Sequence, residues 1–158
     1  MRRTAIVITV LAAALATAPV ATADPTAPQE GTACAADLTD VMTWPSDANM
    51  PLVCVNGQWQ TVTSPPPPND SWLSVGPPMT LHGQGLRNPS VTSGDWTATP
   101  LDANSRCRAE QRAVVEAGVV GPPQIAEGAD GQQLSFRMLP QLFSIEMSGY
   151  CLWTLVRE

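Results

Sequence analysis

The segment LSFRMLPQLFSIEMSGYCLWTL, residues 134–155, carries the clearest pattern in the chain. Apolar side chains alternate with polar ones in three successive short runs. The apolar stripes are Leu134, Phe136 and Met138; Phe143, Ile145 and Met147; and Cys151, Trp153 and Leu155. A period of two indicates β-strands that each turn one face toward an interior. Three such runs so close together predict an antiparallel β-sandwich or a barrel-like sheet.

Upstream of this segment, short apolar stretches are separated by turn-forming clusters such as HGQG, RNPS, TSGD and EGADGQQ. This pattern extends the predicted all-β domain over residues 71–158. Residues 105–117, SRCRAEQRAVVEA, are ambiguous, because their alanine, glutamate and arginine content also suits one short helix. We favour a strand, since Cys107 would then crosslink two strands of one sheet system. In that strand the inward positions are Cys107, Ala109, Gln111, Ala113 and Val115.

The stretches SGDWTATPLDANSRCRAE and GQQLSFRMLPQLFSIEMSGYCLW resemble a pattern in small exported actinobacterial proteins of uncharacterised function. The matching positions are Gly94, Trp96, Cys107, Gly131, Leu134, Phe143, Gly149, Cys151 and Trp153. The resemblance covers about 65 residues and departs from the pattern at Ala109, where an aromatic residue is usual. It implies an all-β, disulfide-linked domain and brings no activity with it.

Four consecutive prolines, Pro65 to Pro68, divide the chain, because they neither continue a helix nor pair within a sheet. We therefore predict a proline-rich linker over residues 64–70 and a small β-hairpin module over residues 31–63. In that module Asn56-Gly57 lies between alternating apolar runs, the strongest short hairpin signal. A two-residue turn places Trp59 opposite Cys54. We therefore expect this indole to shield a disulfide, with ligand binding as the alternative.

The N-terminus has the features of a secretory signal peptide over residues 1–23. Arg2 and Arg3 precede a short apolar run, and Ala21-Thr22-Ala23 offers a cleavage site. The run is too short for a comfortable membrane span, so we expect no stable membrane anchor. The mature protein would be secreted, extracellular or associated with the cell envelope, and residues 24–30 would form a disordered lead-in.

The four cysteines, Cys34, Cys54, Cys107 and Cys151, follow a signal peptide and are therefore expected to form disulfides. Two precede the proline run and two follow it, so the simplest pairing is Cys34 with Cys54 and Cys107 with Cys151. On the chain-entropy model these closures would stabilise the fold by about 3 and 4 kcal/mol. The sequence contains no C-x-x-C pair, the spacing typical of zinc sites, and we expect neither metal nor cofactor.

Removal of the signal peptide would take away Arg2 and Arg3. Six basic residues then remain against fourteen acidic ones, a charge of about −8, and the sequence contains no lysine. Such a chain lacks the cationic field that nucleic-acid or anionic-lipid binding requires. A hydrolase needs a base, and the sole histidine, His82, lies between turn residues with no nucleophile elbow nearby. We therefore expect no catalytic residues and no enzyme activity, with a hydrolase as the third hypothesis.

Binding is the favoured function, because the chain has five tryptophans but one tyrosine and two phenylalanines. Trp44, Trp72 and Trp96 lie near predicted loops or strand starts, where an exposed indole stacks on a sugar ring or an apolar side chain. The alternative for all three is core packing, the usual role of tryptophan in small β domains. We predict a binding module for a cell-wall glycan, a host glycan or a protein. A structural or interaction protein without a small-molecule site is the second hypothesis.

Overall fold

The computed structural model describes residues 25–63 and 68–157. The expected signal peptide and linker residues 64–67 lie outside the described residues. The elements are η1 (Ala36–Leu38), a 3₁₀ turn, and strands β1 (Met42–Thr43), β2 (Leu52–Val55), β3 (Gln58–Thr61), β4 (Ser71–Ser74), β5 (Met79–His82), β6 (Gly94–Pro100), β7 (Arg108–Glu116), β8 (Val119–Val120), β9 (Gln124–Glu127), β10 (Leu134–Met138), β11 (Leu142–Ser148) and β12 (Cys151–Leu155). Within the described ranges, no helix is long and apolar enough to cross a membrane.

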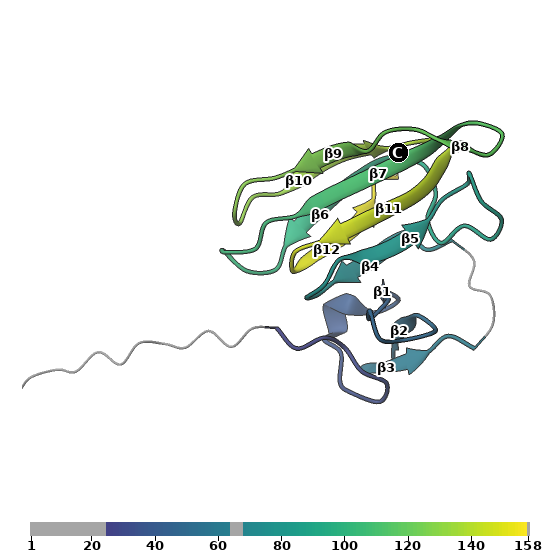
Figure 1. Ribbon diagram of the computed structural model, residues 1–158. Helices are drawn as coiled ribbons and strands as arrows, with labels where there is room; N and C mark the ends of the chain where they lie inside the picture. Colours follow the sequence, from purple (N-terminus) through teal and green to yellow (C-terminus); the bar gives the residue numbers. More distant parts are fainter. Residues whose placement is uncertain (1–24, 64–67, 158) are drawn as a thin grey trace, which may run out of the picture.

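The strands form two sheets that pack as a sandwich, so the predicted β class is confirmed (Figure 1). One sheet has seven strands in the order β10-β6-β12-β4-β1-β2-β3. The other has five, in the order β5-β11-β7-β8, with β9 pairing alongside β7. In Figure 1 the strands β1–β3 extend the larger sheet beyond the sandwich.

The seven-stranded sheet carries a separate apolar cluster on each face. Trp72 lies opposite Trp153, and both belong to the cluster between the sheets, together with Ile145 of β11. Leu73 lies opposite Leu152, and both belong to a second cluster that contains no residue of the five-stranded sheet. Neighbouring residues of a strand point to opposite faces. The second cluster therefore lies on the outer face, the side of the seven-stranded sheet turned away from the five-stranded one.

The β2–β3 hairpin has the predicted register, with Cys54 opposite Trp59 and Leu52 opposite Thr61. Asn56 has a φ of 52° and Gly57 a φ of 76°, the left-handed pair that a two-residue hairpin turn of matching twist requires. The apolar face of this hairpin belongs to the outer-face cluster, under residues 34–41.

Residues 108–116 form strand β7, as favoured, and the alternative helix at 105–117 does not form. The inward prediction holds for Ala109 and Gln111, which are buried, but it is wrong for Val115, whose exposure is 59%. The pairing of β7 with β8 shifts register between Val114 and Glu116, and Val115 is the extra residue at this irregularity. A bulged residue leaves the ladder and takes no regular inward position.

A second irregularity corrects the expected stripe of Phe143, Ile145 and Met147. Pairing of β11 with β7 shifts between Leu142 and Ser144, so Phe143 is the extra residue. Leu142 is buried in its place, whereas Phe143 is half-buried. The alternation of apolar and polar residues does not reveal a bulge. The extra residue reverses which of the flanking side chains face the interior, without any change in composition.

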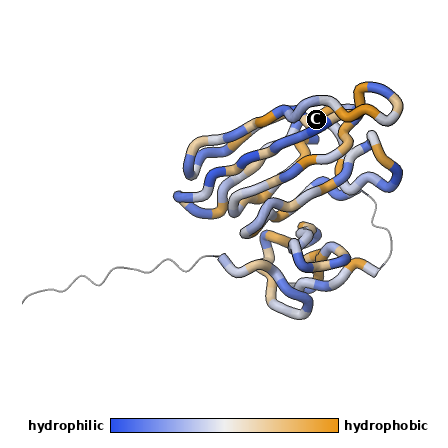
Figure 2. Tube along the Cα trace, viewed as in Figure 1, coloured by the Kyte–Doolittle hydropathy of each residue, from blue (hydrophilic) through white to orange (hydrophobic). Residues whose placement is uncertain are grey.

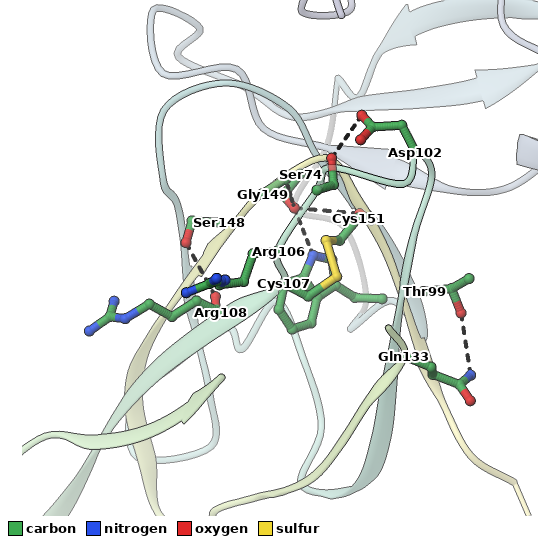
Figure 3. Close-up of a disulfide and its surroundings, with 12 residues drawn as sticks. Ser74, Thr99, Asp102, Arg106, Cys107, Arg108, Gln133, Ser148, Gly149 and Cys151 are labelled. Atoms are coloured by element: carbon green, nitrogen blue, oxygen red, sulfur yellow. Dashed lines mark hydrogen bonds between the residues drawn. A yellow bond between two sulfur atoms is a disulfide. The ribbon is translucent and has the colours of Figure 1, made fainter. Parts of the chain in front are cut away.

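Both expected disulfides are present, Cys34–Cys54 and Cys107–Cys151. Cys107 immediately precedes β7 of the five-stranded sheet, and Cys151 begins β12 of the seven-stranded sheet. The second disulfide therefore ties the two layers of the sandwich together rather than two strands of one sheet. Figure 3 shows this bond beside Gly149 and Ser74, whose hydroxyl donates to the Gly149 carbonyl at 2.7 Å.

The hairpin module and the sandwich share a sheet. β1, which precedes the proline run, pairs in parallel with β4, which follows it, with Met42 opposite Trp72. Residues 25–30, expected as a disordered lead-in, contain no helix or strand. From Gly31 onward the chain pairs with β3, since Gly31 donates to the Trp59 carbonyl and Trp59 to the Thr32 carbonyl.

Candidate binding site

Two of the three tryptophans considered for binding fill the interior. Trp72 is 1% exposed and Trp96 is fully buried. The Trp72 indole N–H donates to the Asn69 carbonyl at 3.1 Å and that of Trp96 to the Thr92 carbonyl at 3.0 Å. Neither ring offers a face to a ligand, because each occupies an inward position of a central strand. The alternative of core packing applies to both.

Trp44 follows β1 and is half-buried. Its indole N–H donates to the Ala48 carbonyl at 3.1 Å, and its backbone N–H donates to the Met79 sulfur at 3.3 Å. The first bond holds the ring against the loop that follows β1, and the second holds the Trp44 backbone beside strand β5. The other tryptophans in the described residues are at most 3% exposed, so Trp44 alone retains an accessible ring.

A hollow of about 240 Å³ lies at this position, and we call it the Trp44 hollow. Its lining is Trp44, Pro45, Ser46, Ala48, Pro78, Met79 and Thr80. An aromatic ring, two prolines and two hydroxyl side chains surround it, with no charged side chain in the lining. This combination suits an apolar or cationic side chain, or a sugar ring, that stacks on the indole.

Two larger clefts lie beside residues 28–29. One, of about 330 Å³, adjoins the loop at 45–50. The other, of about 430 Å³, has Trp59, Leu73 and Tyr150 in its wall on the outer face. No sequence pattern singles out Tyr150, because it precedes β12 in the chain and meets the N-terminal segment only in the folded sheet. Trp59 contributes only a small surface there, because it is 3% exposed.

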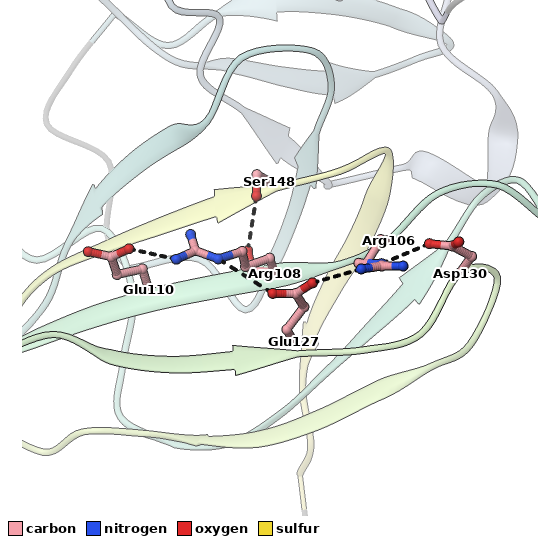
Figure 4. Close-up of polar contacts among 6 residues, drawn as sticks. All are labelled: Arg106, Arg108, Glu110, Glu127, Asp130 and Ser148. Carbon is pink, nitrogen blue, oxygen red and sulfur yellow. Dashed lines mark hydrogen bonds and ion pairs between the residues drawn. The ribbon is translucent and has the colours of Figure 1, made fainter.

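The ionisable groups with shifted pKa values lie at the surface, away from these clefts. Arg106, Arg108 and Arg112 alternate with acidic residues of β7, β9 and the following turn, as Figure 4 shows for most of the row. Hydrogen bonding from Arg108 lowers the pKa of Glu110, and hydrogen bonding to Asp130 raises the pKa of Arg106. These are structural ion pairs on a solvated sheet face.

His82 is exposed at the end of β5 rather than in a loop. In the described part of the chain, no three His, Cys, Asp or Glu side chains lie close enough to hold a metal ion. All four cysteines are in disulfides. The described geometry therefore assembles no recognisable nucleophile and base, and the Trp44 hollow is the strongest candidate site.

Comparison with known proteins adds no assignment. Nothing matched this chain among protein-family models, curated proteins or solved structures. The resemblance to exported actinobacterial proteins thus stays a prediction, and function rests on the site itself.

Proposed function

We propose that this protein is a non-enzymatic binding protein that acts outside the cytoplasm, at the cell envelope or on a host molecule. Its ligand is bound at the Trp44 hollow. The observation that carries the proposal is the half-buried Trp44 ring at the rim of a hollow, held by its indole hydrogen bond to Ala48, while the other four tryptophans are buried. Two disulfides are consistent with an oxidising compartment.

Tryptophan fluorescence tests this proposal directly, because the accessible indole in the described residues is that of Trp44. Titration with peptidoglycan fragments, arabinogalactan fragments, common host glycans and isolated envelope protein should change the emission with one of them. Trp44→Ala should abolish both the change and retention on that material. Ile125→Ala is the matched control, since Ile125 is 57% exposed on β9. Equal retention of the wild-type protein and Trp44→Ala would overturn the assignment of the site.

A protein-interaction role without a small-molecule site is the second candidate. It is favoured by the apolar tip of the β7–β8 hairpin, where Val115, Val119 and Val120 are 59%, 48% and 39% exposed (Figure 2). Isolated exposed valines are ordinary, but three together suit contact with a protein. Loss of retention in Val115→Ser with Val119→Ser, and not in Trp44→Ala, would favour this candidate.

A further inference from the structure

Strand β5 is an edge strand of the five-stranded sheet, whereas the seven-stranded sheet that faces it has further strands beyond this edge. β4 and β5 are joined by residues 75–78 alone, so β5 lies at the corner where the chain crosses between the sheets. Strands β1–β3 extend the seven-stranded sheet beyond that corner. Val53 and Val62, on this extension, are only partly buried against the interior cluster. One layer of the sandwich is therefore shorter than the other at this place.

On the outward edge of β5 the main-chain groups of Thr80 are free, as the alternation of hydrogen bonds along the neighbouring strands shows, whereas the His82 carbonyl accepts from Ser90 and Val91. Ala113 and Cys107 of the β7 segment accept from Gly121 and Gly128, on the side of β8 and β9. The even-numbered residues of β7 therefore hydrogen-bond to β11, where Arg112 lies opposite Ser144 and Glu110 opposite Glu146. The odd-numbered residues of β11 are left to bond β5.

Ile145 and Met147 of β11 lie opposite Leu81 and Met79 of β5. These are accordingly the bonded pairs, and the N–H and C=O groups of Thr80 and His82 point away from the sheet. The His82 carbonyl confirms this direction, because it accepts from Ser90 at 2.7 Å outside the sheet. No backbone bond of Thr80 outside the sheets occurs in the described residues. Thr80 also lines the Trp44 hollow.

The outer edge of β3 is covered, whereas the edges of β10 and β9 are interrupted only locally. The outer edge of β3 pairs with residues 31–34 through Gly31, Thr32 and Cys34. The end of β10 is capped by the Gln111 side chain, which donates to the Arg137 carbonyl and accepts from the Leu139 N–H. Two prolines, at 122–123, separate β8 from β9. Proline and side-chain caps of this kind disfavour strand addition at the positions where they lie.

Two acidic side chains lie beside β5, and residues 25–63 contain no basic residue. Asp47 belongs to the loop that lines the Trp44 hollow, and exposed Glu146 lies directly opposite Thr80 on β11. Neither forms an ion pair within the described residues, whereas Arg106, Arg108, Arg112, Arg137 and Arg157 are all paired with acids elsewhere. Asp47 and Glu146 are thus unpaired acids beside Thr80, while Arg87, in the loop that follows β5, also forms no ion pair in the described residues.

We propose that the outward edge of β5 binds an extended, basic polypeptide segment as an added strand, with one of its side chains in the Trp44 hollow. The segment hydrogen-bonds to the N–H and C=O groups of Thr80, covers the extension formed by β1–β3, and brings lysine or arginine toward Asp47 and Glu146. Main-chain bonds supply affinity in such strand addition, and the alternate side chains supply specificity. This inference rests on the proposed binding role of the Trp44 hollow and names its partner.

The test uses a synthetic acetylated and amidated peptide of sequence Lys-Val-Lys-Thr-Lys-Val-Lys and the mature protein. The wild-type protein should bind it with a change in tryptophan emission that weakens as salt rises. The same peptide with glutamate in place of lysine is the charge control and should not bind. Glycans should not compete. Equal binding of the lysine and glutamate peptides, or no binding of the lysine peptide, would overturn the proposal.

Main-chain recognition has its own signature. Two versions of the lysine peptide are N-methylated at alternate residues, one at the odd and one at the even positions. Only the version whose methylated nitrogens point away from β5 should still bind, because it keeps the N–H groups that donate to β5. Thr80→Pro should weaken binding by about tenfold, the effect of losing one hydrogen bond. Thr80→Val, which keeps the N–H, should bind like the wild-type protein. Proline is tolerated on an outward edge position, and circular dichroism checks the fold.

Equal binding of both methylated phases would exclude strand addition, and this comparison needs no variant, so it holds even where Thr80→Pro misfolds. A glycan that competes with the peptide would instead support sugar binding in the hollow. If Trp44→Ala loses retention on envelope material while the lysine peptide never binds, the proposed function stands and this inference fails.

Discussion

Trp59 lies across from Cys54 on the outer face of the seven-stranded sheet. The indole is 3% exposed and Cys54 is fully buried, whereas Cys34 is half-buried. The ring therefore covers the inner half of the Cys34–Cys54 disulfide. This geometry favours shielding over ligand binding for this tryptophan, although its edge also reaches the neighbouring cleft.

Trp59→Ala should make the Cys34–Cys54 bond more accessible to thiols, and it should speed the reduction of this bond more than that of Cys107–Cys151, whose cysteines are both fully buried. Removing a buried indole should also cost about 3–5 kcal/mol of unfolding free energy. Timed reduction, alkylation and mass spectrometry measure both bonds in one sample. Trp44→Ala is the control, and an unaltered reduction rate in Trp59→Ala would contradict shielding.

Gly57 and Gly149 both have positive φ, at 76° and 93°, but their surroundings differ. A Cβ on Gly57 would meet nothing within 4 Å. A Cβ on Gly149 would overlap the Arg106 carbonyl and lie 3.1 Å from Cys151 Sγ. Gly57 is needed for backbone conformation alone, whereas Gly149 is needed for conformation and for space beside the disulfide in Figure 3.

Gly57→Ala should therefore destabilise the protein by about 1–2 kcal/mol, the cost of a left-handed conformation in a residue with a Cβ. Gly149→Ala should cost clearly more, because steric overlap with backbone adds to that conformational term. Urea unfolding of both variants measures the difference. Equal losses would mean that the Arg106–Gly149 contact relaxes without cost.

At the scale of the element, β7 forms a strand although its composition suits a helix. Alternation decides the outcome, since Ala109 and Gln111 are buried between the sheets while the arginines face solvent. Pairing with β11 and β9 on both sides supplies bonds that an isolated helix would have to make locally. Tertiary context overrides helix propensity here.

The charged row on β7 makes a pH-dependent contribution to stability. Bonding from Arg108 lowers the pKa of Glu110 below its ordinary 4.5, and bonding from Ser105 lowers that of Asp102 below its ordinary 3.8. Lowered folded-state pKa values contribute stability above the ordinary values, and this is lost as pH falls through the folded-state values.

The melting temperature should therefore fall as the solution is acidified below about pH 4.5, and Glu110→Gln should flatten part of that slope. Added salt should reduce the difference between wild type and variant, because the pairs are exposed. Thermal melts over a series of pH values provide the measurement. Glu116→Gln is the control, since Glu116 forms no ion pair in the described residues. Identical slopes for wild type and Glu110→Gln would contradict the role of this pair.

At the scale of the whole molecule, the proline run does not separate two independent cores. β1 pairs with β4, and Leu73 of β4 joins the outer-face cluster with Leu52, Cys54 and Trp59. The hairpin therefore completes its apolar cluster on a strand that belongs to the sandwich. A unit of this size lacks enough surface to bury alone, and sharing a sheet compensates.

Thermal unfolding should accordingly follow one cooperative transition rather than two. Calorimetry of the mature, oxidised protein measures it, with agreement between the calorimetric and van't Hoff enthalpies as the criterion. Leu73→Ala should lower the melting temperature of the whole protein. Two separated transitions would indicate that the hairpin and the sandwich unfold independently.

The binding site was only partly foreseeable. Trp44, Trp72 and Trp96 have similar sequence contexts, yet Trp72 and Trp96 lie within β4 and β6, whereas Trp44 follows the two-residue strand β1. The point at which a strand ends depends on pairings between distant residues, and this decides the difference. The edge position of β5 could not be predicted either, because the sequence alone does not show which strand lies at the edge of a sheet.

Local chemistry in the sequence determined the strands, the hairpin turn and its register. Alternation sets which side chains share a face, and the Asn56-Gly57 pair fixes the turn within a few residues. Only the tertiary structure decided that Cys107–Cys151 joins two layers, that the hairpin shares a sheet with β4, and that Val115 and Phe143 leave the alternation. These features depend on contacts between residues far apart in the chain, whose packing energies are not encoded in any single stretch.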